Sequence, residues 1–152
     1  SATTTTDTGI YNTGAITGGA VSLSSTQSTS TATLTTIYLP GLVTANSLTV
    51  NASGGASSTI VTLGAITLNA GGGNISVTAN NAAAGANAGI TQTGAISNNA
   101  IGSSISFTSN HKINQTGAIA LVANTGTSAA NISYDTTAGI NTSTATCPAG
   151  TF

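Results

Sequence analysis

The sequence predicts an all-β protein: a parallel β-solenoid of about five to six coils of 23–30 residues, with about three short strands in each coil. Three observations lead to this prediction. A glycine-containing motif recurs along the chain, a second motif recurs out of phase with it, and charged residues make up only 2% of the composition. Parallel crossover connections favour a right-handed coil.

The first motif reads Ile-x-x-x-Gly-(Ala/Leu)-(Ile/Val), and its copies begin at Ile10, Ile37, Ile60, Ile90 and Ile113, with a sixth start at Ile140. Its glycines are expected to stack in one column, because glycine suits a sharp corner that needs unusual φ and ψ angles. These corner glycines are Gly14, Gly41, Gly64, Gly94 and Gly117. The last apolar residue of each copy is expected to point inward, in a column formed by Ile16, Val43, Ile66, Ile96 and Ile119.

The second motif is an apolar residue, then Ser or Thr, then another apolar residue, with spacings of 27, 27, 30 and 27 between copies. Alternation with a period of two is typical of a half-buried strand. The first apolar positions predict an inward column of Val21, Leu48, Ile75, Ile105 and Ile132. The second apolar positions predict another inward column, of Leu23, Val50, Val77, Phe107 and Tyr134. The hydroxyl positions predict an outward ladder of Ser22, Thr49, Ser76, Ser106 and Ser133.

Stacking of the coils is required by burial. One coil cannot bury its inward residues alone, so its neighbours must complete the core and accept its backbone hydrogen bonds.

We divide the chain into three parts. Residues 1–9 form a Thr-rich leader, which is a candidate intersubunit strand; residues 10–142 form the solenoid repeats; and residues 143–152 form a C-terminal tail.

The scarcity of charge excludes several classes of partner. Lys112 is the only basic residue and the net charge is -1. Nucleic-acid binding requires a basic patch, which one lysine cannot form. No run of 18 apolar residues exists, so no membrane insertion is expected.

We expect no catalytic activity, no cofactor and no metal ion. His111 is the only histidine, and we interpret His111-Lys112 as a polar pair in a loop that enters a strand, in preference to a catalytic triad with Asp135. One His, one Cys and two distant carboxylates do not supply a metal-ligand set. The three glycines at residues 71–73 lack the following Lys of a phosphate-binding loop and predict a corner.

Three further side-chain features lead to predictions, and two of them allow an alternative. Tyr11 and Tyr38 share an outward column, where cross-strand packing is favoured over sugar binding. Gln92 above Gln115 predicts a ladder of side-chain amides. Cys147, the only cysteine, lies past the last strand and is a candidate for a disulfide cross-link between subunits; an unpaired thiol is the alternative.

Four segments carry a resemblance to a known family: GITQTGAI at residues 89–96, KINQTGAI at 112–119, SLTVNA at 47–52 and GAITLNA at 64–70. They resemble the β-helical repeat regions of filamentous-haemagglutinin-like adhesins and related bacterial surface exoproteins, over roughly residues 9–141. The resemblance implies a right-handed parallel β-helix, secretion, and a shaft or adhesive role without catalytic residues. The chain departs from that family in its shorter length and in lacking Asn-Pro-Asn secretion motifs.

The function expected from these observations is structural. The protein is expected to be a subunit of an extracellular or cell-surface filament, assembling head to tail through the open ends of its solenoid. Its partners are expected to be other copies of itself, with host surface or matrix glycans as a second class. The alternatives are a shaft fragment of a large surface adhesin, an ice-binding solenoid, and a pilus subunit that donates its leader as a strand.

Overall fold

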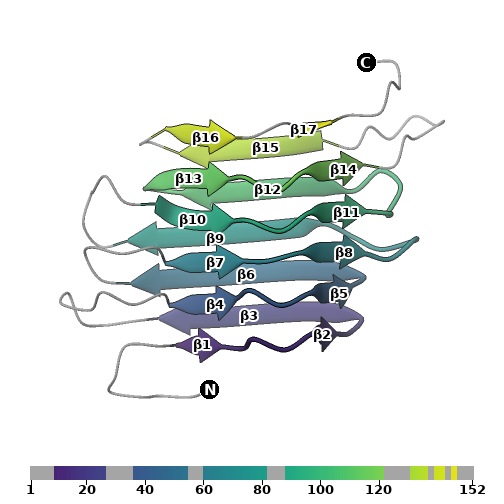
Figure 1. Cartoon of the computed structure of the whole chain (residues 1–152), viewed down its shortest axis with the longest axis horizontal. Coiled ribbons are helices and arrows are strands. Elements are labelled where there is room, and N and C mark those ends of the chain that lie inside the picture. The colour runs from purple at the N-terminus through teal and green to yellow at the C-terminus, as the bar shows by residue number, and fades with distance from the viewer. Residues whose placement is uncertain are drawn as a thin grey trace.

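The protein is a β-solenoid built from three parallel sheets (Figure 1). The computed structural model describes residues 9–26, 36–54, 60–81, 88–121, 131–136, 139–142 and 145–146. Every regular element within these residues is a strand. Each of the first five coils contributes one strand to each sheet, and the described part of the sixth coil contributes to two of the sheets. The predicted fold class is therefore confirmed.

The three sheets contain six, six and five strands. The first sheet consists of β1 (Ile10–Tyr11), β4 (Ile37–Leu39), β7 (Val61–Leu63), β10 (Ala88–Gln92), β13 (Lys112–Gln115) and β16 (Ile140–Thr142). The second sheet consists of β2 (Ile16–Thr17), β5 (Val43–Ala45), β8 (Ile66–Leu68), β11 (Ile96–Asn98), β14 (Ile119–Leu121) and β17 (Ala145–Thr146). The third sheet has the longest strands: β3 (Ala20–Thr26), β6 (Ser47–Gly54), β9 (Ile75–Asn81), β12 (Ser104–Ser109) and β15 (Asn131–Thr136).

The coil is right-handed. In Figure 1, β1 and β2 run from left to right in front of β3, which returns behind them, and successive coils rise toward the C-terminus. This handedness agrees with the general preference of parallel crossovers.

The core is a set of stacked apolar columns. In the third sheet, strand pairing places Val21, Leu48, Ile75, Ile105 and Ile132 in one column and Leu23, Val50, Val77, Phe107 and Tyr134 in the next. In the second sheet, it aligns Ile16, Val43, Ile66, Ile96 and Ile119. The intervening hydroxyls Ser22, Thr49, Ser76, Ser106 and Ser133 also align and alternate with these inward residues. The alternation explains the burial, because successive side chains of a strand point to opposite faces.

One register in the first sheet differs from the sequence prediction. The motif alignment placed Ile60 in the column of Ile37 and Ile90, but both of these residues pair with Val61. Both Ile60 and Val61 are buried. The sequence pattern could not choose between two adjacent β-branched residues that both enter the core.

The corner glycines are required for a different reason from the one predicted. Among the described residues, the glycines with positive φ are Gly71, Gly102 and Gly139, none of which belongs to the corner column. Instead, the backbone of the preceding coil occupies the place where a Cβ would lie. A Cβ would overlap the Gly14 carbonyl oxygen from Gly41, the Pro40 carbonyl oxygen from Gly64, the Ala65 nitrogen from Gly94, and the Gly94 carbonyl oxygen from Gly117. The glycines therefore permit close stacking of the coils.

The predicted amide ladder is also replaced by another arrangement. Gln92 and Gln115 are pairing partners and both are fully buried. Each side-chain nitrogen donates to the carbonyl oxygen two residues ahead in its own coil, at Gly94 and Gly117 respectively. Each glutamine nitrogen thus satisfies a corner carbonyl inside the core. The side-chain oxygen of Gln115 accepts a hydrogen bond from Tyr134, whereas that of Gln92 is buried without a partner among the described residues.

The strands extend slightly past the predicted end of the repeats at residue 142. β17 pairs with β14 in the second sheet, and it lies at residues 145–146. The leader at residues 1–8 and Cys147 lie outside the described residues, so their predicted roles stay predictions.

Candidate functional site

The two ends of the solenoid are its most unusual surfaces. In the first coil, the inward residues Ile10, Ile16, Val21 and Leu23 are only half-buried. Their pairing partners in the second coil, Ile37, Val43, Leu48 and Val50, are buried. The difference has a simple cause: within the described residues, a coil covers the second coil from each side, whereas the first is covered from one side only. The first coil therefore presents apolar surface along the solenoid axis.

The C-terminal end presents the complementary surface. Ile140 of β16 is 45% exposed, although its pairing partner Ile113 is fully buried. Ile10 and Ile140 stand at opposite ends of the same column, which runs through Ile37, Val61, Ile90 and Ile113. Both ends thus expose the same kind of side chain at the same place in the coil.

Gly14 differs from the other corner glycines. A Cβ at Gly14 would have one near neighbour among the described residues, the Asn12 side-chain oxygen at 3.3 Å. That oxygen already accepts a 2.8 Å hydrogen bond from the Gly14 nitrogen, and a flexible side chain can shift to make room. Gly14 is therefore a corner glycine like the others, but no coil lies beneath it in the described part of the chain.

An aromatic pair closes the core near the C-terminal end. The rings of Phe107 and Tyr134 stack with 5.5 Å between their centroids. The Tyr134 hydroxyl donates a 3.1 Å hydrogen bond to the side-chain oxygen of Gln115. Desolvation by burial raises the pKa of Tyr134 above its ordinary value of 10.0.

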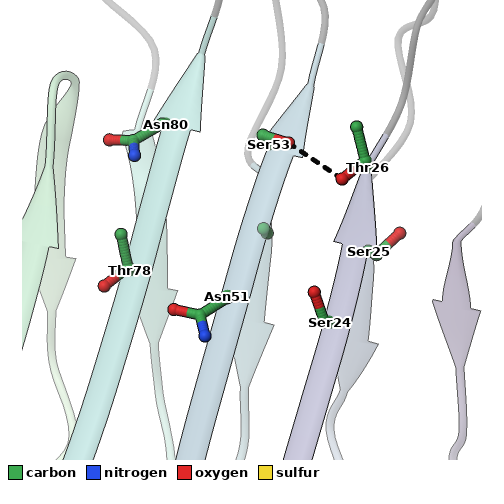
Figure 2. Close-up of a pocket in the computed structure, with 8 residues that line it drawn as sticks. Ser24, Ser25, Thr26, Asn51, Ser53, Thr78 and Asn80 are labelled. Atoms are coloured by element: carbon green, nitrogen blue, oxygen red, sulfur yellow. Dashed lines mark hydrogen bonds between the residues drawn. The ribbon is translucent and has the colours of Figure 1, made fainter.

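A second candidate surface is the outer face of the third sheet. Side chains of β3, β6 and β9 line a groove of about 250 Å³, shown in Figure 2. We call it the polar groove, and it is formed by Ser24, Ser25, Thr26, Asn51, Ala52, Ser53, Thr78 and Asn80. The hydroxyl ladder predicted from the sequence lies one outward row away, but this groove was not predicted. The sequence does contain Asn and Thr residues that alternate with the core positions, but their alignment into a groove follows from the strand register.

The tyrosines of the first sheet pack against each other. Tyr11 and Tyr38 are pairing partners, and their rings stack with 5.0 Å between centroids and an interplanar angle of 15°. Each ring covers one face of the other, and Tyr11 is 63% exposed. This geometry agrees with the predicted packing; sugar binding by this pair stays the alternative.

No catalytic constellation emerges in the part of the chain with described conformation. His111 lies in a bend directly before β13, as predicted, but it is fully buried, and its backbone nitrogen donates to the Ser109 hydroxyl at 3.1 Å. The described residues hold no group of three His, Cys, Asp or Glu side chains that could bind a metal ion. They also form no helix of the length and apolarity needed to cross a membrane.

Comparison with known proteins adds no family assignment. No family model, curated protein or solved structure matches the chain. The candidate functional surfaces are therefore the two ends of the solenoid and its polar face.

Proposed function

We propose that this protein is a structural subunit of an extracellular filament, in which the last coil of one copy stacks beneath the first coil of the next. The observation that carries this proposal is the glycine at position 14. In the other four corners, glycine makes room for the backbone of the preceding coil. At Gly14 the described chain provides no such backbone, so the glycine is explained if another copy provides it.

The apolar ends support the same arrangement. Stacking two copies places Ile140 of one copy against Ile10 of the next and continues a column of Ile and Val. Such burial removes apolar surface from water at both ends, at roughly 25 cal/mol per Å². Since all the sheets are parallel, the strand direction is the same in every coil and the copies need no inversion.

The edge strands support association as well. β1, β2 and β3 end the three sheets on one side, and β16, β17 and β15 end them on the other. Soluble proteins protect such edges with Lys, Pro or bulges, because unpaired backbone groups recruit other strands. Neither end coil carries Lys or Pro in its described residues. A contact between two different ends does not close on itself, so repetition generates a filament.

A second candidate has the same geometry. The resemblance to adhesin repeats favours a shaft segment, in which neighbouring coils of one long chain would cover both ends. The two proposals differ in whether the chain of 152 residues assembles by itself.

Electron microscopy of the purified protein tests the proposal. The wild-type protein is expected to form thin fibres, and Ile140→Glu is expected to prevent them by placing a charge in the end contact. Ile101→Glu is the matched control, because Ile101 is 64% exposed on a turn at the side of the coil. Fibres from the Ile140→Glu protein would contradict the end-to-end contact. Particles without fibres in every sample, up to millimolar concentration, would favour the shaft-segment alternative.

A further inference from the structure

The polar groove holds two rows of hydrogen-bonding side chains that run along the solenoid axis. Strand pairing aligns Ser24, Asn51 and Thr78 in one row and Thr26, Ser53 and Asn80 in the other. Neighbouring members of a row are about 4.8 Å apart, and the rows are about 6.6 Å apart along the strands. Figure 2 shows both rows on the outer face of β3, β6 and β9. The groove between them therefore follows the axis.

Most of this hydrogen-bonding capacity is directed outward. Among the side chains that line the polar groove, the one hydrogen bond is from the Ser53 hydroxyl to the Thr26 hydroxyl, at 3.2 Å (Figure 2). The side chains of Ser24, Asn51 and Asn80 are exposed. A hydroxyl both donates and accepts, and an amide offers two donors and an acceptor. The groove can thus exchange hydrogen bonds with a ligand that has many hydroxyl groups.

The electrostatics favour an uncharged ligand. The side chains lining the groove are all neutral. A charged ligand would lose hydration there without gaining a counter-charge. The row of Ser24, Asn51 and Thr78 continues through Thr108 to Asp135, whose carboxylate repels a polyanion that extends along the axis.

We propose that the polar groove binds a neutral polysaccharide chain lying along the solenoid axis. A polymer with regularly repeated hydroxyl groups can meet a hydrogen-bonding side chain at each strand it crosses. Ice is a poorer match, because Ser, Asn and Thr side chains differ in length and leave a hollow where ice requires a flat surface.

Binding by one subunit does not depend on filament formation. Single hydrogen bonds exchanged with water contribute little net affinity, so one groove binds weakly. In a filament, many grooves would act on one polysaccharide and raise the avidity, and that gain alone rests on the proposed function.

Surface plasmon resonance on immobilised polysaccharides tests the inference. The full chain carries Ile140→Glu, which keeps subunits separate and lies outside the groove. We expect saturable binding to at least one neutral polymer among galactomannan, β-glucan, arabinoxylan and dextran, and none to heparin or alginate. The combined substitution Asn51→Ala and Thr78→Val removes two groups from one row and should weaken binding about tenfold or more.

Thr67→Val is the matched control, because Thr67 is a half-exposed outward threonine of the second sheet. It should leave the affinity unchanged, and circular dichroism should show the same strand content for all variants. Equal affinity of the double variant and the wild type would overturn the proposal, as would binding to polyanions alone or to no neutral polymer. Shaping of ice crystals, lost in the double variant and without polysaccharide binding, would assign the groove to ice instead.

Discussion

The ring of Tyr134 lies parallel to that of Phe107, with 5.5 Å between their centroids and 14° between their planes. The two residues are Cα partners in β15 and β12, so the contact is a direct consequence of strand register. Phe107 is fully buried and Tyr134 packs against the core from the C-terminal side. The pair shows how each coil buries the coil before it.

Alkaline pH is expected to destabilise the fold through Tyr134. Burial raises its pKa in the folded state above 10.0, so the folded protein holds this proton more tightly than the unfolded chain does. The contribution of Tyr134 to the free energy of unfolding is fully present below pH 10 and is lost as the pH rises through the folded-state pKa. Denaturant unfolding between pH 8 and pH 12 measures this loss. Tyr134→Phe should remove it, whereas Tyr38→Phe should retain it; identical pH profiles for both variants would contradict this assignment.

Ile105→Asp is expected to destabilise the protein by at least about 3 kcal/mol, because it buries an unpaired carboxylate. Ile105 is fully buried between Ile75 and Ile132 in its column. Ser106→Asp is the matched control: the neighbouring side chain is half-exposed, so its effect should stay within about 1 kcal/mol. Equal midpoints for the two variants in urea unfolding would show that the inward assignment is wrong.

Alanine substitutions at two glycines should destabilise the protein by different mechanisms. Gly117→Ala forces a Cβ onto the Gly94 carbonyl oxygen and should cost about 3 kcal/mol or more, since backbone cannot move aside easily. Gly71 has open space around it but a φ of +75°, so Gly71→Ala should cost only about 1–2 kcal/mol. Comparison of the unfolding free energies distinguishes the mechanisms. A larger loss for Gly71→Ala than for Gly117→Ala would restore the conformational explanation of the corner column.

Much of the fold was predictable because like residues stack on like residues at similar spacing. The column that contains Ile105 follows from the alternation within the second motif and its recurrence, and the column that contains Ile96 follows from the recurrence of the first motif. The slip from Ile60 to Val61 did not, because either residue satisfies the pattern. The role of the corner glycines was also not predictable. A position with a left-handed φ and a position without space for a Cβ both favour glycine, so the sequence does not distinguish them.

The candidate sites were less predictable than the core. The rows of the polar groove follow the 27-residue repeat, but the hollow between the rows depends on the side chains that surround it, and the burial of His111 likewise depends on its surroundings in the folded chain. Open ends could be expected from any solenoid. Their significance at Gly14 became apparent only after the other corner glycines had shown what the residue accommodates.

The most direct test of end-to-end stacking is the fibre content of Gly14→Ala, measured by sedimentation and electron microscopy. A Cβ at Gly14 meets only the flexible Asn12 side chain within the described subunit, so its unfolding free energy should stay within about 0.5 kcal/mol of the wild type. Gly73→Ala is the control, because its Cβ would make an ordinary 3.4 Å contact with Ser47 in the middle of the stack. Fibres are expected from the wild type and Gly73→Ala, and single subunits from Gly14→Ala. Fibres of equal abundance from Gly14→Ala would contradict it, since no backbone could then lie beneath Gly14.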